Sequence, residues 1–290
     1  VLMELLQKAG LSAYVGKVNM DRNSPEFLIE ETNQSLADTK VWLDTSAQFG
    51  PLVKPIITPR FVPSCTSELM TGLAKLAKEY DVPVQSHLSE NHGEIDWVAS
   101  LHPESSNYTD VYYEHHLMGT VPTVMAHCIH LSDVEMDRMA ETQTMVSHCP
   151  YSNVNLSSGI APIRKLIERN IPIGLGSDIS GGHIVSMAKV LTEAIGLSKM
   201  KWAEVDPNYA PLTLSEAFYM ATKGGGQFFG HVGSFEKGYE LDALIIDDTS
   251  LFDPNERSLE ERLERWLYVG DDRHIIERYV AGRVVPSPKG

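Results

Sequence analysis

The sequence predicts an α/β protein whose main domain is a (β/α)8 barrel of the TIM type. Apolar, strand-like runs alternate with helical stretches along the first 180 residues, which predicts a parallel sheet. Most of these runs are followed by polar residues that include His or Asp, as expected where a barrel carries its active site at the carboxyl ends of its strands. An open doubly wound sheet is the alternative, but it would gather such residues at a single switch point.

Taken in order, the elements support this prediction but give an incomplete barrel. Helices are expected at 1–10, 26–49, 66–80, 132–142 and 160–170. Barrel strands are expected at 12–18, 53–60, 82–87, 123–128, 144–149 and 171–178. These are six strands where a closed barrel has eight. The sequence also starts within a helical pattern and without Met, so we expect the first two strands to be missing from it.

The pattern changes after residue 240. Short strands are expected at 241–248, 264–270, 274–280 and 282–285, with a charged, solvated helical run over 256–265. We therefore predict two domains: the incomplete hydrolase barrel over 1–235, and part of a small β-sandwich domain over 236–290.

Composition narrows the possible partners and surroundings. The formal net charge of −15 argues against nucleic acids and anionic membranes, which both require positive patches. No apolar run reaches membrane-spanning length. The three cysteines (Cys65, Cys128 and Cys149) cannot all pair, which favours a reducing, cytoplasmic location.

Residues suited to metal chemistry follow the predicted strands. In chain order, the strand-end residues are Arg60, His87 with Glu90, His127, His148 and Asp178. Imidazole and carboxylate groups are common ligands of divalent metals, and a catalytic metal keeps one position for water, whose pKa it lowers. Their repetition at successive strand ends predicts a metal-dependent hydrolase.

Several stretches carry a family resemblance. They are MDRN (20–23), PRFVPSC (59–65), QSHLSEN (85–91), MAHCIHL (125–131), SHCPYSNVNLSSG (147–159) and GLGSDISGG (174–182). In this order they resemble the amidohydrolase superfamily and, within it, the guanine deaminase family. The later GSFEKGYELDALIIDD (233–248) resembles the superfamily's return into a small β-sandwich domain.

The resemblance implies catalytic and metal-binding roles for four residues. His87 and Asp178 become metal ligands, with Zn²⁺ as the expected metal and Fe²⁺ as the alternative. Asp178 also takes a proton from the nucleophilic water, and Glu90 shuttles a proton to the purine ring. His127 becomes a pocket residue that assists the water.

The family resemblance also implies a substrate and a reaction. Arg60 is expected to donate to the purine carbonyl and Phe61 to pack on the ring, in a substrate site that His87, Glu90 and Asp178 complete. The expected reaction is hydrolytic deamination of guanine to xanthine and ammonia, in purine catabolism or salvage. The expected assembly is a homodimer.

One departure from the family pattern leaves alternatives open. The superfamily's first strand supplies two more metal ligands in a His-x-His motif, and this sequence contains none. Either the upstream portion is missing, which we favour, or the metal site has been lost. The chain could also act on another aminated heterocycle (a pterin, an adenosine derivative or a triazine) as a deaminase or chlorohydrolase. A non-catalytic barrel relative is the alternative from outside the enzymes.

Overall fold

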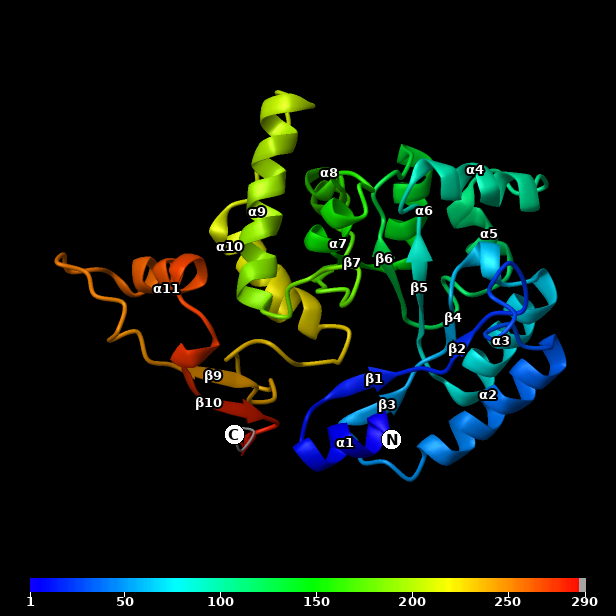
Figure 1. Cartoon of the computed structure of the whole chain (residues 1–290), viewed down its shortest axis with the longest axis horizontal. Helices are drawn as coiled ribbons and strands as arrows, with labels where there is room; N and C mark the ends of the chain where they lie inside the picture. The colour runs from blue at the N-terminus through cyan, green and yellow to red at the C-terminus, as the bar shows by residue number, and fades with distance from the viewer. Residues whose placement is uncertain (287–290) are drawn as a thin grey trace. The chain divides into compact units, whose positions relative to one another are not determined.

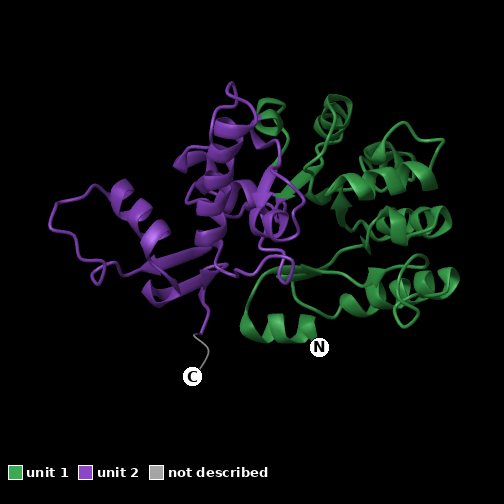
Figure 2. Cartoon of the chain, turned by 45° about the horizontal axis from the view of Figure 1, so that its top comes forward, with its two compact units in different colours: residues 1–147, 165–172 green, residues 148–164, 173–290 purple. Residues whose placement is uncertain are grey.

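The computed structural model describes residues 1–286 of the chain, which form helices and short strands (Figure 1). The last four residues of the predicted C-terminal domain, 287–290, lie outside the described part. Two compact units are distinguished: unit 1 comprises 1–147 and 165–172, and unit 2 comprises 148–164 and 173–290 (Figure 2).

Unit 1 alternates strands with helices, as predicted. Its strands, with β7 ending one residue into unit 2, are β1 (Ala13–Val15), β2 (Val18–Asn19), β3 (Val53–Pro55), β4 (Thr58–Pro59), β5 (Val84–Leu88), β6 (Thr123–His127) and β7 (Met145–His148). Its helices are α1 (Leu2–Ala9), α2 (Thr32–Ser46), the 3₁₀ turn η1 (Val62–Ser64), α3 (Ser67–Tyr80), α4 (His92–Leu101), α5 (Tyr108–Glu114) and α6 (Asp133–Thr142).

The strands of unit 1 are parallel. β1 pairs with β3, β2 with β4, β5 with β6 and β6 with β7, all in parallel register. Ile57 forms a parallel bridge to Val84, which places the β3–β4 segment next to β5. Taking β1–β2 and β3–β4 each as one interrupted strand, successive strands along the chain lie side by side, as successive β/α units require.

Side chains alternate between buried and half-buried along β5 and β6. In β5, Val84, Ser86 and Leu88 are buried while Gln85 and His87 are half-buried. This is the period-2 pattern of a strand, because successive Cβ atoms point to opposite faces. His87 thus lies on the opposite face from the buried Val84 and Leu88.

Unit 2 contains β8 and the C-terminal elements. They are α7 (Pro150–Asn155), β8 (Ile173–Leu175), α9 (Met187–Glu204), α10 (Leu214–Tyr219), the π-helical turn η2 (Met220–Gly224), β9 (Ala243–Ile246), α11 (Leu259–Val269), η3 (Asp272–His274), β10 (Ile275–Val280) and β11 (Arg283–Val284). The helix α8 (Ile163–Glu168) is divided between the two units. β9, β10 and β11 form an antiparallel sheet in the order β11-β10-β9, so strands are confirmed within 241–248, 274–280 and 282–285.

The predicted strand over 264–270 is wrong, because these residues continue α11. Ser258 caps the helix with Glu261 in a reciprocal capping box, and the helix buries Trp266 and Leu267 on one face. A short apolar run of this kind fits both a strand and the buried face of a helix, so the sequence pattern alone does not distinguish them. The helix predicted from residue 26 also begins later, at Thr32, with Glu31 as its N-cap.

Candidate active site

His87 is held in one tautomer by the backbone of the preceding strand segment. Its Nδ1 lies 2.7 Å from the carbonyl oxygen of Arg60. A carbonyl can only accept, so Nδ1 carries the proton of the neutral ring and donates it there. The lone pair is consequently on Nε2, which is the arrangement found in metal-binding histidines whose other ring nitrogen donates to a backbone carbonyl.

His127 and Glu90 lie beside His87 in unit 1. The rings of His87 and His127 are stacked, with centroids 5.5 Å apart and planes inclined by 21°. Oε2 of Glu90 lies 3.7 Å from Nε2 of His127, and the His127 side chain is only 1% exposed. The structure thus brings together three residues that the sequence placed at two strand ends: a carboxylate that is within reach of solvent and two imidazoles.

Backbone hydrogen bonds join the turn that follows β5 to the turn that follows β6. The carbonyl of Ser89 accepts hydrogen bonds from the backbone N–H groups of Ile129 and His130, both at 3.1 Å. Ser89 (φ 49°) and His127 (φ 70°) both have left-handed backbone, which is unfavourable for residues other than glycine. Such conformations are concentrated at functional sites, where the surrounding structure enforces them.

Arg60 contributes to this site through its backbone, while its side chain is exposed. Its N–H donates to the carbonyl of Asn19 at 3.0 Å, and its own carbonyl holds His87 as described. The guanidinium carbon lies 5.5 Å from the ring centroid of Phe61, whose edge-on aromatic neighbour is Trp97 at 6.3 Å. A positive charge and an aromatic face are therefore adjacent on the loop after β4.

Asp178 lies in unit 2, in the loop that follows β8. It also has left-handed backbone (φ 44°), and its carbonyl accepts from the N–H of Gly182 at 2.6 Å. A Cβ atom on Gly181 would approach Oδ2 of Asp178 to 2.7 Å and Oγ of Ser152 to 2.6 Å. Gly181 therefore accommodates the protein's own side chains.

Two further residues of unit 2 contact this loop and were not singled out from the sequence. The side-chain amide of Asn155 donates to the carbonyl of Gly181 at 2.9 Å and contacts Nδ1 of His183. Asn155 lies within the stretch 147–159, and His183 directly follows the last glycine of GLGSDISGG, so their positions in and next to these motifs were the available signal. His148, one of the strand-end residues noted in the sequence, is 2% exposed.

His87 by itself has the form of a metal-binding histidine. The neutral ring with a free Nε2 lone pair and a carbonyl on Nδ1 is the form that binds metals. Among residues 1–286, no three His, Cys, Asp or Glu side chains come together as a metal site.

Comparisons with known proteins place the chain in a family. The model of the amidohydrolase family matches residues 1–285. This chain belongs to the amidohydrolase family. The fold of that family is a TIM barrel and the chain is α/β, so the predicted fold class is confirmed.

The chain is similar to guanine deaminases of several organisms. It is 44% identical to the guanine deaminase of Dictyostelium discoideum and 36% identical to that of Escherichia coli, over 98% of this chain in both cases. It covers 65% of the length of each of these proteins, so it spans slightly less than two thirds of them.

Solved structures agree with this assignment. A crystal structure of guanine deaminase from C. acetobutylicum, with guanine bound in its active site, superimposes with a TM-score of 0.95 at 52% identity. The match covers 98% of this chain and 68% of that one.

Amidohydrolases generally bind a divalent metal. No helix among residues 1–286 is long and apolar enough to cross a membrane.

Proposed function

We propose that the protein catalyses the hydrolytic deamination of guanine to xanthine and ammonia. The observation that carries the proposal is the grouping of Glu90, His127 and the metal-competent tautomer of His87 at adjacent strand ends. The similarity to guanine deaminases over nearly the whole chain supports the choice of substrate.

Each of the four proposed catalytic and metal-binding residues has its own role in the reaction. His87 and Asp178 would hold the metal, which when bound lowers the pKa of water. Asp178 receives the proton of the attacking water. After the amino group is protonated, the C2–N bond breaks and ammonia leaves. Glu90 passes a proton to ring N3 of the purine, so that negative charge does not build up as C2 becomes tetrahedral. His127, buried beside Glu90, orients the water.

Arg60 and Phe61 are the proposed contacts with the purine. The exposed guanidinium can donate to the C6 carbonyl, and the neighbouring ring can pack on the flat heterocycle. A hydrogen-bonding group in a binding site discriminates strongly against analogues that lack its partner. Arg60 would thus favour guanine over purines that carry no carbonyl at C6.

Zinc is the metal that we propose. A histidine nitrogen and a carboxylate oxygen suit Zn²⁺, and they also suit Fe²⁺, which is the alternative. Metal analysis of the purified full-length protein distinguishes the two.

A substrate panel tests the proposed reaction. The full-length protein should turn over guanine with a kcat/KM well above that for a pterin, an adenosine derivative and an aminated or chlorinated triazine. A preference for one of these heterocycles would replace guanine but keep the reaction class. Metal-loaded protein that turns over none of them would favour the non-catalytic alternative.

The location and assembly that we propose are a reducing, cytoplasmic compartment and a homodimer. The three cysteines, Cys65, Cys128 and Cys149, are all buried and cannot all pair with one another, which supports the first point. Size-exclusion chromatography with light scattering tests the second.

A further inference from the structure

The turn that carries Glu90 rests on a buried carboxylate from the next helix. Glu94, in the first turn of α4, is 7% exposed. Its Oε2 accepts the backbone N–H of Glu90 at 2.9 Å, and its Oε1 accepts the hydroxyl of Tyr108 at 2.7 Å. Both carboxylate oxygens are therefore engaged, one of them by the backbone of Glu90 itself.

This contact differs from ordinary helix capping. In a capping box, the third residue of the helix bonds back to the N–H of the N-cap residue. Here the bond to the N-cap, Asn91, is the longer one at 3.4 Å, and the shorter bond reaches one residue further, to Glu90. Glu94 thus acts on the candidate proton shuttle as well as on the helix end.

Two stacked tyrosines of α5 complete the support. The rings of Tyr108 and Tyr112 lie 5.7 Å apart. The hydroxyl of Tyr112 donates to the carbonyl of His87 at 2.9 Å and contacts Oγ of Ser86 at 2.8 Å. Burial raises the pKa of both hydroxyls, so they stay protonated and remain donors.

We propose that Glu94, Tyr108 and Tyr112 are positioning residues that fix the His87–Glu90 segment for proton transfer. Tyr112 holds the carbonyl of His87, and Glu94, braced by Tyr108, holds the amide of Glu90 three residues later. The segment between them passes through the left-handed residue Ser89. Small displacements of a catalytic group are costly, so this support should affect turnover more than binding. The inference rests on the proposed role of Glu90.

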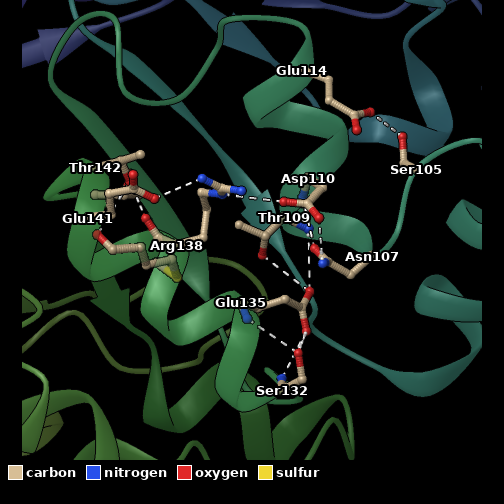
Figure 3. Close-up of polar contacts among 12 residues, drawn as sticks. Ser105, Asn107, Thr109, Asp110, Glu114, Ser132, Glu135, Arg138, Glu141 and Thr142 are labelled. Carbon is tan, nitrogen blue, oxygen red and sulfur yellow. Dashed lines mark hydrogen bonds and ion pairs between the residues drawn. The ribbon is translucent and has the colours of Figure 1, made fainter.

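Glu135 provides a matched control in the same unit. It occupies the same position in the capping box of α6, with Ser132, and is 6% exposed. It accepts from Thr109, and Figure 3 shows these contacts between α5 and α6. Glu135→Gln therefore removes a buried, helix-capping carboxylate that, within residues 1–286, bonds Ser132 and Thr109 and not the Glu90 turn.

The first measurement compares the steady-state kinetics of Glu94→Gln and Glu135→Gln in full-length, metal-loaded protein. The amide cannot accept from both Tyr108 and Glu90, because one of its two atoms is a donor only. We expect kcat of Glu94→Gln to fall about ten- to hundredfold, the range seen when a group that orients a functional residue is removed. KM should change little, and Glu135→Gln should keep its kcat. Tyr108→Phe, which preserves the ring stacking, should shift kcat in the same direction by a smaller factor.

A double-mutant cycle separates positioning from general destabilisation. If Glu94 acts through Glu90, Glu94→Gln should cost almost nothing further in a Glu90→Gln background, because the group that it positions is already lost. An undiminished second penalty would overturn the proposal. So would an equal loss of kcat in Glu94→Gln and Glu135→Gln.

Hydrogen exchange tests the positioning without any substrate. Glu94→Gln should speed exchange of the Glu90 amide selectively, while Glu135→Gln leaves it unchanged. If the wild-type protein fails to turn over guanine, the proposed function fails and this measurement still decides the positioning. Unchanged protection of the Glu90 amide in Glu94→Gln would overturn it.

Discussion

The Nδ1 atom of His87 lies 2.7 Å from the backbone carbonyl oxygen of Arg60. The contact fixes the proton on Nδ1 and leaves Nε2 as the atom that can bind a metal. It also links the loop after β4 to the end of β5, so one residue pair joins the proposed substrate contact to the proposed metal ligand.

Replacing His87 should abolish metal binding. We expect His87→Ala to lose both its metal and its activity during dialysis, because the imidazole is a ligand and alanine offers none. Metal content measured by plasma mass spectrometry checks this. His116→Asn, at an exposed histidine of the same unit that also has left-handed backbone, serves as the control and should keep its metal. Full metal occupancy in His87→Ala would remove His87 from the ligand set.

Replacing Glu90 should leave the metal in place. Glu90→Gln preserves size and hydrogen-bonding shape but cannot carry a proton, so we expect turnover to drop by about 10²–10⁴ with guanine still bound. Metal analysis and kinetics on the same preparation check both parts. Glu141→Gln, at an exposed carboxylate of α6, is the control. Loss of metal from Glu90→Gln, or nearly normal turnover, would give the carboxylate a different role.

The variant Arg60→Ala should distinguish the role of the Arg60 side chain from that of its backbone carbonyl. Arg60→Ala keeps the carbonyl that orients His87 and removes only the exposed guanidinium. Loss of a hydrogen bond from a charged donor typically costs about 1.5–3 kcal/mol, so kcat/KM for guanine should fall at least tenfold. The free energy of unfolding should change by less than about 0.5 kcal/mol, as for other surface substitutions. Unchanged kcat/KM would place the side chain outside the pocket.

The order of strands and helices in unit 1 could be predicted because each element carries its own period and end signals. The run 82–87 alternates between faces, and β5 forms there with His87 at its end. The strand predicted over 264–270 was wrong because an apolar run of seven residues fits a strand and the buried face of a helix equally well. The capping box that begins at Ser258 marks the start of a helix there. Local pattern alone could not resolve that ambiguity.

The proximity of three proposed site residues could be predicted from the sequence, whereas their contacts could not. His87, Glu90 and His127 were expected near one another because parallel strand ends share one edge. That the carbonyl of Arg60 orients His87, and that Glu94 and Tyr108 hold Glu90, depends on approaches between segments separated in the chain. Glu94 reads in sequence only as an ordinary capping residue, since its reach to Glu90 depends on the turn at Ser89.

One ion pair in unit 2 should make the folding stability of the protein fall at acidic pH. The guanidinium of Arg164 bonds both oxygens of Glu216, at 2.7 and 2.9 Å, and lowers the pKa of that carboxyl from 4.5 to about 2. A folded-state pKa below the unfolded value gives stability that is present above pH 4.5 and is lost as the pH falls toward 2.

The variant Glu216→Gln isolates this contribution. Urea unfolding between about pH 5.5 and 3.5 should show a shallower fall in the free energy of unfolding for the variant than for the wild type, since one linked proton is removed. Identical slopes in the two proteins would show that the pair does not respond to pH.

The central claim is tested most directly by measuring both products of the reaction at once. Purified, metal-loaded full-length protein is incubated with guanine, and xanthine is quantified by chromatography while ammonia is quantified in the same samples. Hydrolytic deamination predicts that xanthine and ammonia appear in equal amounts as guanine disappears, and that the Glu90→Gln protein forms both far more slowly. Guanine that persists unchanged beside wild-type protein carrying its metal would contradict the account.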